Sequence, residues 1–203
     1  MTRISKKPEI RKNEILDVAE ELFAKEGFDN TPVSKIVNKV GVAKGTFYYY
    51  FNSKEDIIVA ILERRFNYIK KKINKVINDK TYTPIKKLEM LLIELIFPHK
   101  EGNNYVNNIK IDENAKIHQK RDVLFFEIFE PYIEMVVKEG VEKGSFNTNN
   151  IGETSKILFL GIDRYIHICY NTLNNKKILD KRIKAITEVI ERVLGIEGNL
   201  NLR

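Results

Sequence analysis

The segment that decides the fold is TPVSKIVNKVGVAKGTFYYYFNSKEDI, residues 31–57. Its apolar residues recur at helical spacing on both sides of Gly41, and glycine adopts the left-handed backbone of a tight turn at the lowest cost. The segment therefore predicts two short helices, 32–39 and 43–50, that pack against each other across a turn. Their contact is expected from the apolar side chains Ile36, Val37, Val40, Val42 and Phe47.

Signals for helix starts and ends flank this segment. Thr31 is expected to cap the first short helix, with Pro32 at its first position. Ser53, followed three residues later by Asp56, has the pattern of a capping box, so the next helix is expected over 54–78. A preceding helix over about 7–25, ended by a glycine, completes a three-helix N-terminal domain.

The second short helix is expected to turn polar groups outward. These are Lys44, Gly45, Thr46, Tyr48 and Tyr49. Glycine allows the helix backbone to approach another molecule closely, and lysine and threonine can donate to base edges in a DNA major groove. Tyrosine hydroxyls suit phosphate oxygens. Phe47 and Phe51 are expected in the core. The pattern favours a DNA-binding helix-turn-helix.

Lys54 adds a separate indication. A cation in the first turn of a helix opposes the helix dipole by about 0.3–1 kcal/mol. A phosphate at that helix end would explain the cation, and the alternative is an exposed lysine that costs little. We expect Lys54 to contact a phosphate, so that Lys54→Ala would weaken binding to all DNA sequences alike.

Residues 31–57 resemble the DNA-binding signature of the TetR family of bacterial transcriptional regulators, the TetR/AcrR type of helix-turn-helix. The matching elements are Thr31, Ile36, Gly41-Val42, Lys44-Gly45-Thr46, Phe47-Tyr48, Phe51 and Ser53-Lys54. The resemblance implies that Lys44, Gly45, Thr46 and Tyr48 lie near base edges. It implies that phosphates are contacted by Thr31, Ser34, Tyr49, Tyr50 and Lys54.

Some residues depart from the family pattern. Val37 and Val40 stand where alanine is common, Ala43 replaces a serine or threonine cap, and Tyr49 replaces a frequent histidine. These departures bear on individual contacts and leave the helix-turn-helix prediction intact.

The remaining chain predicts an all-α protein with further helices over 84–97, 113–143 (bent at Pro131), 151–173 and 178–194, and a loop over 100–108. We expect a helix-turn-helix DNA-binding domain over 1–53. A ligand-binding and dimerisation domain is expected over 54–203, joined through the connecting helix 54–78.

The helix 151–173 is apolar on nearly all sides, so it is expected to be buried on nearly all sides. One face would meet the helix 178–194 and a symmetry mate, and the other would line a pocket. The resemblance implies a homodimer through these two helices. Its two recognition helices would then face a palindromic operator in double-stranded DNA, with half-sites about 34–36 Å apart.

An aromatic cluster is the candidate effector pocket, although such a cluster at helical spacing is more often core. It comprises Phe97, Phe125, Phe126, Phe129, Tyr132 and Tyr165. This lining favours a small, mostly apolar effector. Asp163, Arg164 and His167 lie in the apolar helix, where they predict an ion pair or, for Arg164 and His167, groups that orient a ligand. The effector is expected to pivot the helix 54–78 and release a repressor from DNA.

Other classes of protein are disfavoured. The formal net charge of +7 favours an anionic partner. The single Cys169 excludes an intrachain disulfide and suits a reducing cytoplasm. No signal peptide, membrane span, catalytic constellation or cofactor motif is evident, and His99, His118 and His167 lack metal-ligand spacing. The alternatives kept open are an architectural DNA binder without an effector, a metal sensor, and a peripheral membrane protein using the basic half of the helix 54–78.

Overall fold

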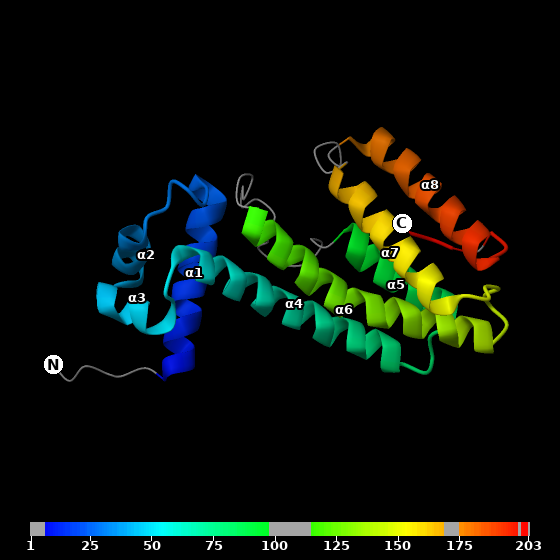
Figure 1. Ribbon diagram of the computed structural model, residues 1–203, viewed down its shortest axis with the longest axis horizontal. Coiled ribbons are helices and arrows are strands. Elements are labelled where there is room, and N and C mark those ends of the chain that lie inside the picture. Colours follow the sequence, from blue (N-terminus) through cyan, green and yellow to red (C-terminus); the bar gives the residue numbers. More distant parts are fainter. Residues whose placement is uncertain (1–6, 98–114, 169–174, 199, 203) are drawn as a thin grey trace. The chain divides into compact units, whose positions relative to one another are not determined.

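Helices make up all the regular structure of the described chain. The computed structural model describes residues 7–97, 115–168, 175–198 and 200–202. Over these ranges it has eight α-helices and no strand, which confirms the all-α class (Figure 1). They are α1 (Pro8–Glu26), α2 (Val33–Val40), α3 (Lys44–Tyr50), α4 (Lys54–Asn78), α5 (Pro84–Ile96), α6 (Ala115–Glu142), α7 (Ile151–Ile168) and α8 (Lys176–Leu194).

Some predicted features lie outside the described residues. They are the loop over 100–108, the end of the helix predicted over 151–173, and Cys169. The predicted helix over 113–143 is present as α6 and continues through Pro131. Within the described ranges, no helix is long and apolar enough to cross a membrane.

The described residues form two compact units. Of the described residues, the N-terminal unit contains those from 7 to 68 and from 115 to 125, and the C-terminal unit contains the others. Both α4 and α6 therefore contribute to both units. The boundary predicted between residues 53 and 54 stays a prediction, and the N-terminal unit includes the first half of α4.

The N-terminal unit is held by an apolar core and by ion pairs between α1 and α4. Phe23, Ile36 and Phe47 are fully buried, and burial of such side chains stabilises a fold by about 1.5–3 kcal/mol each. Arg64 of α4 donates to Asp17 at 2.6 Å and to Glu20 at 2.8 Å, both on α1. The first half of α4 is thereby fastened to α1.

The start of α2 differs from the prediction. Thr31 does not cap this helix, because its side chain is buried and its hydroxyl donates to the carbonyl of Gly27 at 2.8 Å. Pro32 occupies the N-cap position and the helix begins at Val33. The predicted cap is therefore replaced by another local contact, in which Thr31 bonds to a carbonyl four residues earlier in its own loop.

The predicted capping box at the start of α4 is confirmed. The backbone N–H of Asp56 donates to Ser53 Oγ at 3.1 Å. In return, the Asp56 carboxylate accepts from the backbone N–H of Asn52 at 2.9 Å. The first bond satisfies an amide that the first turn of α4 leaves without an intrahelical partner. The return bond reaches Asn52, one residue before the N-cap Ser53.

Buried polar contacts organise the C-terminal unit. Lys87 on α5, which is almost fully buried, pairs with Glu139 on α6 at 2.9 Å. Hydrogen bonds from Lys143 and Lys87 lower the pKa of the Glu139 carboxyl, so it is ionised at neutral pH. Glu89 on α5, also buried, accepts from the backbone N–H of Asn201 at 2.7 Å and so holds the C-terminal segment.

Candidate nucleic-acid interface

The turn between α2 and α3 has the geometry that the sequence predicts. Gly41 adopts a left-handed conformation, with φ 76° and ψ 38°. Its N–H and that of Val42 donate to the carbonyl of Val37 at 2.9 and 3.0 Å, which ends α2. α3 then begins at Lys44 (Figure 1). The two short helices share a core through the buried Ile36 and Phe47.

The outward face of α3 is exposed, as expected. Tyr48 is 50% exposed and Tyr49 is 77% exposed. Lys44 is also exposed, and its ammonium lies 5.9 Å from the centre of the Tyr48 ring. No atom lies within 4 Å of where a Cβ on Gly45 would stand, so this part of α3 is open to another molecule. Thr46 is half-buried beside this face.

The aromatic run 47–51 divides between the core and the surface. Phe47 and Phe51 are buried, which confirms the prediction that both belong to the core. Tyr50 is half-buried, with its ring 4.8 Å from that of Tyr49 in an edge-to-face arrangement. Tyr48 and Tyr49 are therefore the members of the run with substantial exposed area.

Two residues predicted to contact phosphates are engaged inside the protein. Thr31 is fully buried, and its hydroxyl is bound to Gly27. Lys54 turns its ammonium toward the loop between α1 and α2, where it donates to the carbonyl of Phe28 at 2.6 Å. Ser34, the remaining α2 residue on the predicted list, is exposed.

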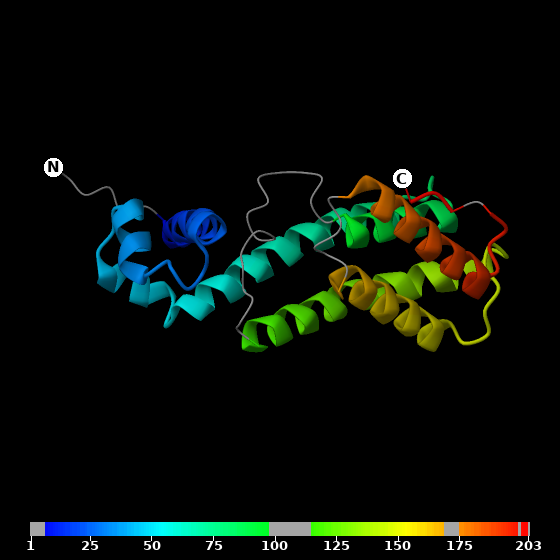
Figure 2. The ribbon, with the colours of Figure 1, turned by 90° about the horizontal axis from the view of Figure 1, so that it is seen from above.

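The predicted effector-pocket residues do not form one group. The ring centres of Phe126 and Phe129 on α6 lie 5.8 and 6.2 Å from that of Phe159 on α7, which runs beside α6 (Figure 2). Phe159 is not among the residues predicted to line the pocket. The Tyr132 hydroxyl donates to Asn74 at 2.8 Å. An apolar residue in an apolar helix gives no local signal that distinguishes a ring beside this cluster from other core rings, which is why Phe159 was missed.

The remaining pocket predictions fall elsewhere. Phe125 belongs to the N-terminal unit, where its ring lies 5.9 Å from that of Phe66. Phe97 is half-buried at the end of α5, and Arg164 is exposed on α7. The side chain of His167 lies outside the described residues. Tyr165 is 42% exposed and lines a different hollow, described next.

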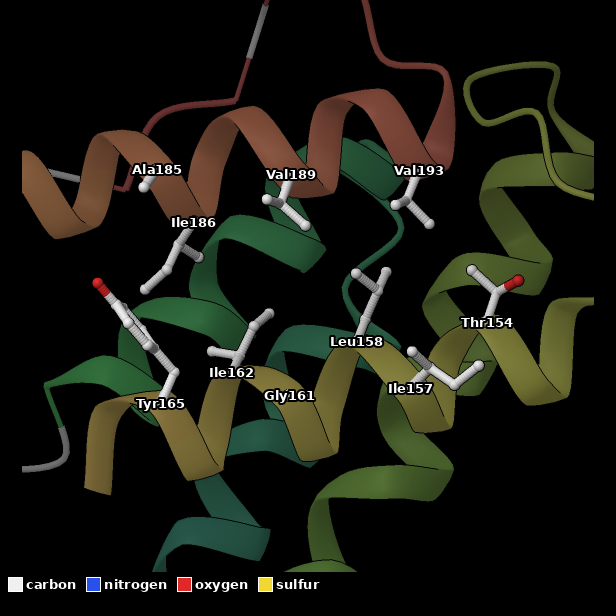
Figure 3. A pocket seen from close by; sticks show the side chains of 10 residues that line it. All are labelled: Thr154, Ile157, Leu158, Gly161, Ile162, Tyr165, Ala185, Ile186, Val189 and Val193. Atoms are coloured by element: carbon white, nitrogen blue, oxygen red, sulfur yellow. The ribbon is translucent and has the colours of Figure 1, made fainter. Parts of the chain in front are cut away.

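An apolar groove of about 510 Å³ runs between α7 and α8. Side chains of the two helices point toward one another across it (Figure 3). The groove is lined by Thr154, Ile157, Leu158, Gly161, Ile162, Tyr165, Ala185, Ile186, Val189 and Val193. Ile157 and Ile168 of α7 are each 69% exposed in the single chain, so the burial of α7 on nearly all sides, which includes packing against a symmetry mate, stays a prediction.

Comparisons with known proteins agree with this geometry. The family model "Bacterial regulatory proteins, tetR family" matches residues 15–61. The fatty acid metabolism regulator protein of Bacillus subtilis (strain 168) is 30% identical over 138 residues, covering 64% of this chain and 68% of that protein. IcaR of Staphylococcus aureus (strain Newman), a negative transcriptional regulator of a biofilm operon, is 33% identical over 90 residues, covering 44% and 48%.

Solved structures support the same assignment at the level of the fold. The transcriptional regulator FadR from Bacillus subtilis, in complex with stearoyl-CoA, superposes with a TM-score of 0.68 at 21% identity, covering 91% of this chain and 99% of that one. The chain belongs to the TetR family of bacterial transcriptional regulators.

Proposed function

We propose that this regulator binds a palindromic operator as a homodimer and represses transcription until a mostly apolar effector releases it. The observation that carries the proposal is the exposed face of α3. Tyr48 and Tyr49 present ring and hydroxyl to solvent beside the ammonium of Lys44. Large aromatic groups left exposed with hydrogen-bond donors are accounted for by a nucleic-acid partner. The relatives described above are transcription regulators and not enzymes.

The proposed contacts divide by position. Near base edges we place Lys44, Gly45, Thr46 and Tyr48. Lysine can donate to guanine, threonine can offer its hydroxyl or methyl group, and the bare glycine lets α3 approach the bases closely. Ser34 and Tyr49 are exposed and are proposed to donate to phosphates. Tyr50 is half-buried, so its hydroxyl is proposed as a phosphate contact at the edge of this surface.

A second copy of the chain is the proposed occupant of the groove between α7 and α8. Ile157 and Val189 line the groove and are each more than half exposed, and aliphatic side chains of this kind offer water no hydrogen bond. Packing α7 and α8 against their symmetry mates would bury them in a four-helix bundle. The resulting two-fold axis would present two copies of α3 to half-sites about one DNA turn apart.

The effector is proposed to act through the C-terminal unit. Phe126, Phe129 and Phe159 form a cluster of aromatic rings, and an aromatic lining favours a hydrophobic or amphipathic compound. FadR of Bacillus subtilis, similar in fold, was solved with stearoyl-CoA, so long-chain acyl-CoA is the first class to test. α4 contributes to both units, so a movement of α4 that depends on the ligand would reach the DNA-binding unit. DNA affinity would then change by the ratio of the ligand's affinities for the two positions of α4.

Selection of bound duplexes from a random pool at about 0.15 M salt tests the proposed DNA binding. We expect a palindromic consensus whose half-sites lie about one helical turn apart. Binding without a consensus would contradict the proposal and favour an architectural DNA binder. Failure to bind any duplex, by protein refolded after removal of bound small molecules, would overturn the DNA-binding proposal itself.

Fluorescence anisotropy on the selected operator then tests the effector. Saturating stearoyl-CoA is expected to weaken operator binding by about 5- to 150-fold, the usual range of allosteric coupling. Stearate and free coenzyme A serve as separate controls for the chain and the headgroup. An unchanged affinity with stearoyl-CoA bound would contradict the proposed coupling, and a lack of binding would contradict the proposed ligand class.

A further inference from the structure

The chain turns back on itself where α8 ends. Residues 195–198 and 200–202, which we call the strap, follow Leu194 and run back beside α8 (Figure 1). Gly195 and Gly198 both have a φ of 63°, in the left-handed region that glycine adopts at the lowest cost. The two glycines therefore allow the chain to reverse directly after the helix.

Two successive backbone amides of the strap are bound by carboxylates from different helices. The N–H of Leu200 donates to Glu191 of α8 at 3.2 Å. The N–H of Asn201 donates to Glu89 of α5 at 2.7 Å. Glu89 is buried, and its second carboxylate oxygen accepts from Lys86 at 2.9 Å. A buried carboxylate is stable only when it is paired and hydrogen-bonded, so the strap supplies one of the bonds that Glu89 requires.

Apolar side chains of the strap are buried as well. Ile196, Leu200 and Leu202 all belong to the core, and Leu202 is only 1% exposed. Burial of aliphatic side chains stabilises a fold in proportion to the apolar area that is removed from water. The strap is therefore docked both by its backbone and by its side chains, and it forms part of the packed C-terminal unit.

The strap holds α8 from the side opposite the groove. Val189 lines the groove, and Glu191, two positions later, binds the strap. Successive residues of a helix are about 100° apart around its axis, so the side chains of Val189 and Glu191 leave α8 in nearly opposite directions. α7 packs against both α5 and α8, and the strap connects α5 and α8 a second time. α8 is therefore held by α7 on one side and by the strap on another.

We propose that the strap is a positioning element for the dimer: by tying α8 to α5 it fixes the separation of α7 and α8, and thereby the shape of the groove that receives the partner subunit. This inference rests on the proposed dimerisation through α7 and α8. Without the docked strap, α8 would lose the connection to α5 that the strap makes and would sample a wider range of positions. Association would then have to order α8, and the conformational entropy lost in doing so weakens binding.

Sedimentation equilibrium over a range of protein concentrations measures the dissociation constant of the dimer. Leu202→Ser, in the full chain, places a polar group where the strap is most deeply buried and is expected to undock it. We expect the dissociation constant to rise about ten-fold. Operator affinity is expected to fall at low protein concentration and to return at high concentration, because the proposed DNA-binding surface on α3 is unchanged.

Variants of Glu89 test the polar half of the contact. Glu89→Leu removes the acceptor for the Asn201 N–H and keeps a side chain of similar size, whereas Glu89→Gln keeps an acceptor oxygen. We expect Glu89→Leu to weaken the dimer as Leu202→Ser does, and Glu89→Gln to retain most of the wild-type association. Glu197→Ala is the matched control, because Glu197 is an exposed residue of the strap, and it is expected to leave the dissociation constant unchanged.

A core substitution on α6 separates positioning from a general loss of stability. Val136 is fully buried, so Val136→Ala is expected to lower the melting temperature by leaving a cavity. Its dimer dissociation constant is expected to stay near that of the wild type at a temperature where circular dichroism shows the subunit to be folded. Leu202→Ser is expected to raise the dissociation constant at that same temperature.

Two results would overturn the inference. One is a wild-type dissociation constant in both Leu202→Ser and Glu89→Leu. The other is a rise in Val136→Ala equal to that in Leu202→Ser, since the strap would then act only through the stability of the subunit. A wild-type protein that stays monomeric at every concentration would instead refute the proposed dimer, so the two failures cannot be confused.

Discussion

The two exposed faces that stand out, on α3 and between α7 and α8, differ in chemistry more than in exposure. Tyr48 on α3 is 50% exposed, and Val189 in the groove between α7 and α8 is 53% exposed. On α3 the large side chains are tyrosines, accompanied by Lys44, so each carries a group that can hydrogen-bond. Between α7 and α8 the exposed side chains are predominantly aliphatic.

This difference shows that the chemistry of the exposed side chains, more than their exposed fraction, indicates the class of partner that a surface binds. Aromatic rings with hydroxyls and a neighbouring ammonium complement phosphates and base edges, which are polar and anionic. Aliphatic side chains gain nothing from such a partner and are stabilised only by burial, at about 25 cal/mol per Å². Substitutions on the two faces are therefore expected to have different effects. Those on α3 should impair base recognition, and those between α7 and α8 should impair the dimer.

The largest effect is expected from a charge in the groove. Val189 is 53% exposed in the single chain, so Val189→Glu costs the isolated subunit little, whereas in a dimer it would bury an unpaired carboxylate. We expect monomers by light scattering. Operator affinity is expected to fall about 100-fold or more, because two linked half-site contacts normally gain 10²–10⁴ over one.

Lys184→Glu is the control for this change. It places a carboxylate at an exposed position of the same helix that does not line the groove. This variant is expected to remain dimeric and to bind the operator nearly as the wild type does. If Val189→Glu remained dimeric with unchanged operator affinity, the aliphatic face would not be the dimer interface.

An intermediate effect is expected from substituting alanine for Gly45 or for Gly161, two glycines with free space where a side chain would stand. A Cβ at Gly45 or at Gly161 would meet no atom of its own chain within 4 Å. Gly45→Ala should hold α3 back from the bases and lower operator affinity about ten-fold. Its stability should be equal to or up to about 1 kcal/mol above that of the wild type.

Gly161→Ala provides the counterpart in the groove. We expect it to raise the dissociation constant of the dimer, so that its effect on DNA binding disappears at high protein concentration. Anisotropy titrations at several protein concentrations distinguish the two variants. A concentration-dependent defect in Gly45→Ala would contradict the assignment of α3 to the DNA.

The smallest effect is expected from removing one exposed hydroxyl. Tyr49→Phe keeps the ring and removes a donor to phosphate, and affinities for operator and random DNA are both expected to fall about three-fold. Tyr68, 58% exposed on α4, is the matched tyrosine outside the proposed surface, and Tyr68→Phe is expected to have no effect on either DNA. Equal effects of the two substitutions in anisotropy titrations would show that exposure alone, and not placement on α3, sets the contribution.

The sequence was a reliable guide where structure is local. The Gly41 turn, the Ser53–Asp56 capping box and the burial of Phe47 and Phe51 all depend on residues a few positions apart. The predictions for Thr31 and Lys54 were also local, since they relied on capping and helix-dipole rules, and the structure gives both residues other partners. Thr31 instead bonds to Gly27, four residues earlier in its own loop, and Lys54 binds the Phe28 carbonyl, 26 positions away.

The aromatic residues show a second limit. Helical spacing identified Phe125, Phe126 and Phe129 as apolar. It could not predict that the Phe125 ring contacts Phe66 while the rings of Phe126 and Phe129 contact Phe159. Successive positions on a helix point in directions about 100° apart, so their side chains meet different helices. The pairing of such rings depends on which elements pack together, and a single helix does not encode that.

The sequence by itself determined the helical class, the helix-turn-helix with its turn, and the family, because turn chemistry, capping and apolar periodicity act over a few residues. Only the tertiary structure decided that the Lys54 ammonium faces the α1–α2 loop, and that α7 and α8 leave an aliphatic groove open in the single chain. The physical reason is that these features depend on contacts between residues distant in the chain. Lys54 and Phe28, 26 positions apart, meet only once the helices have packed.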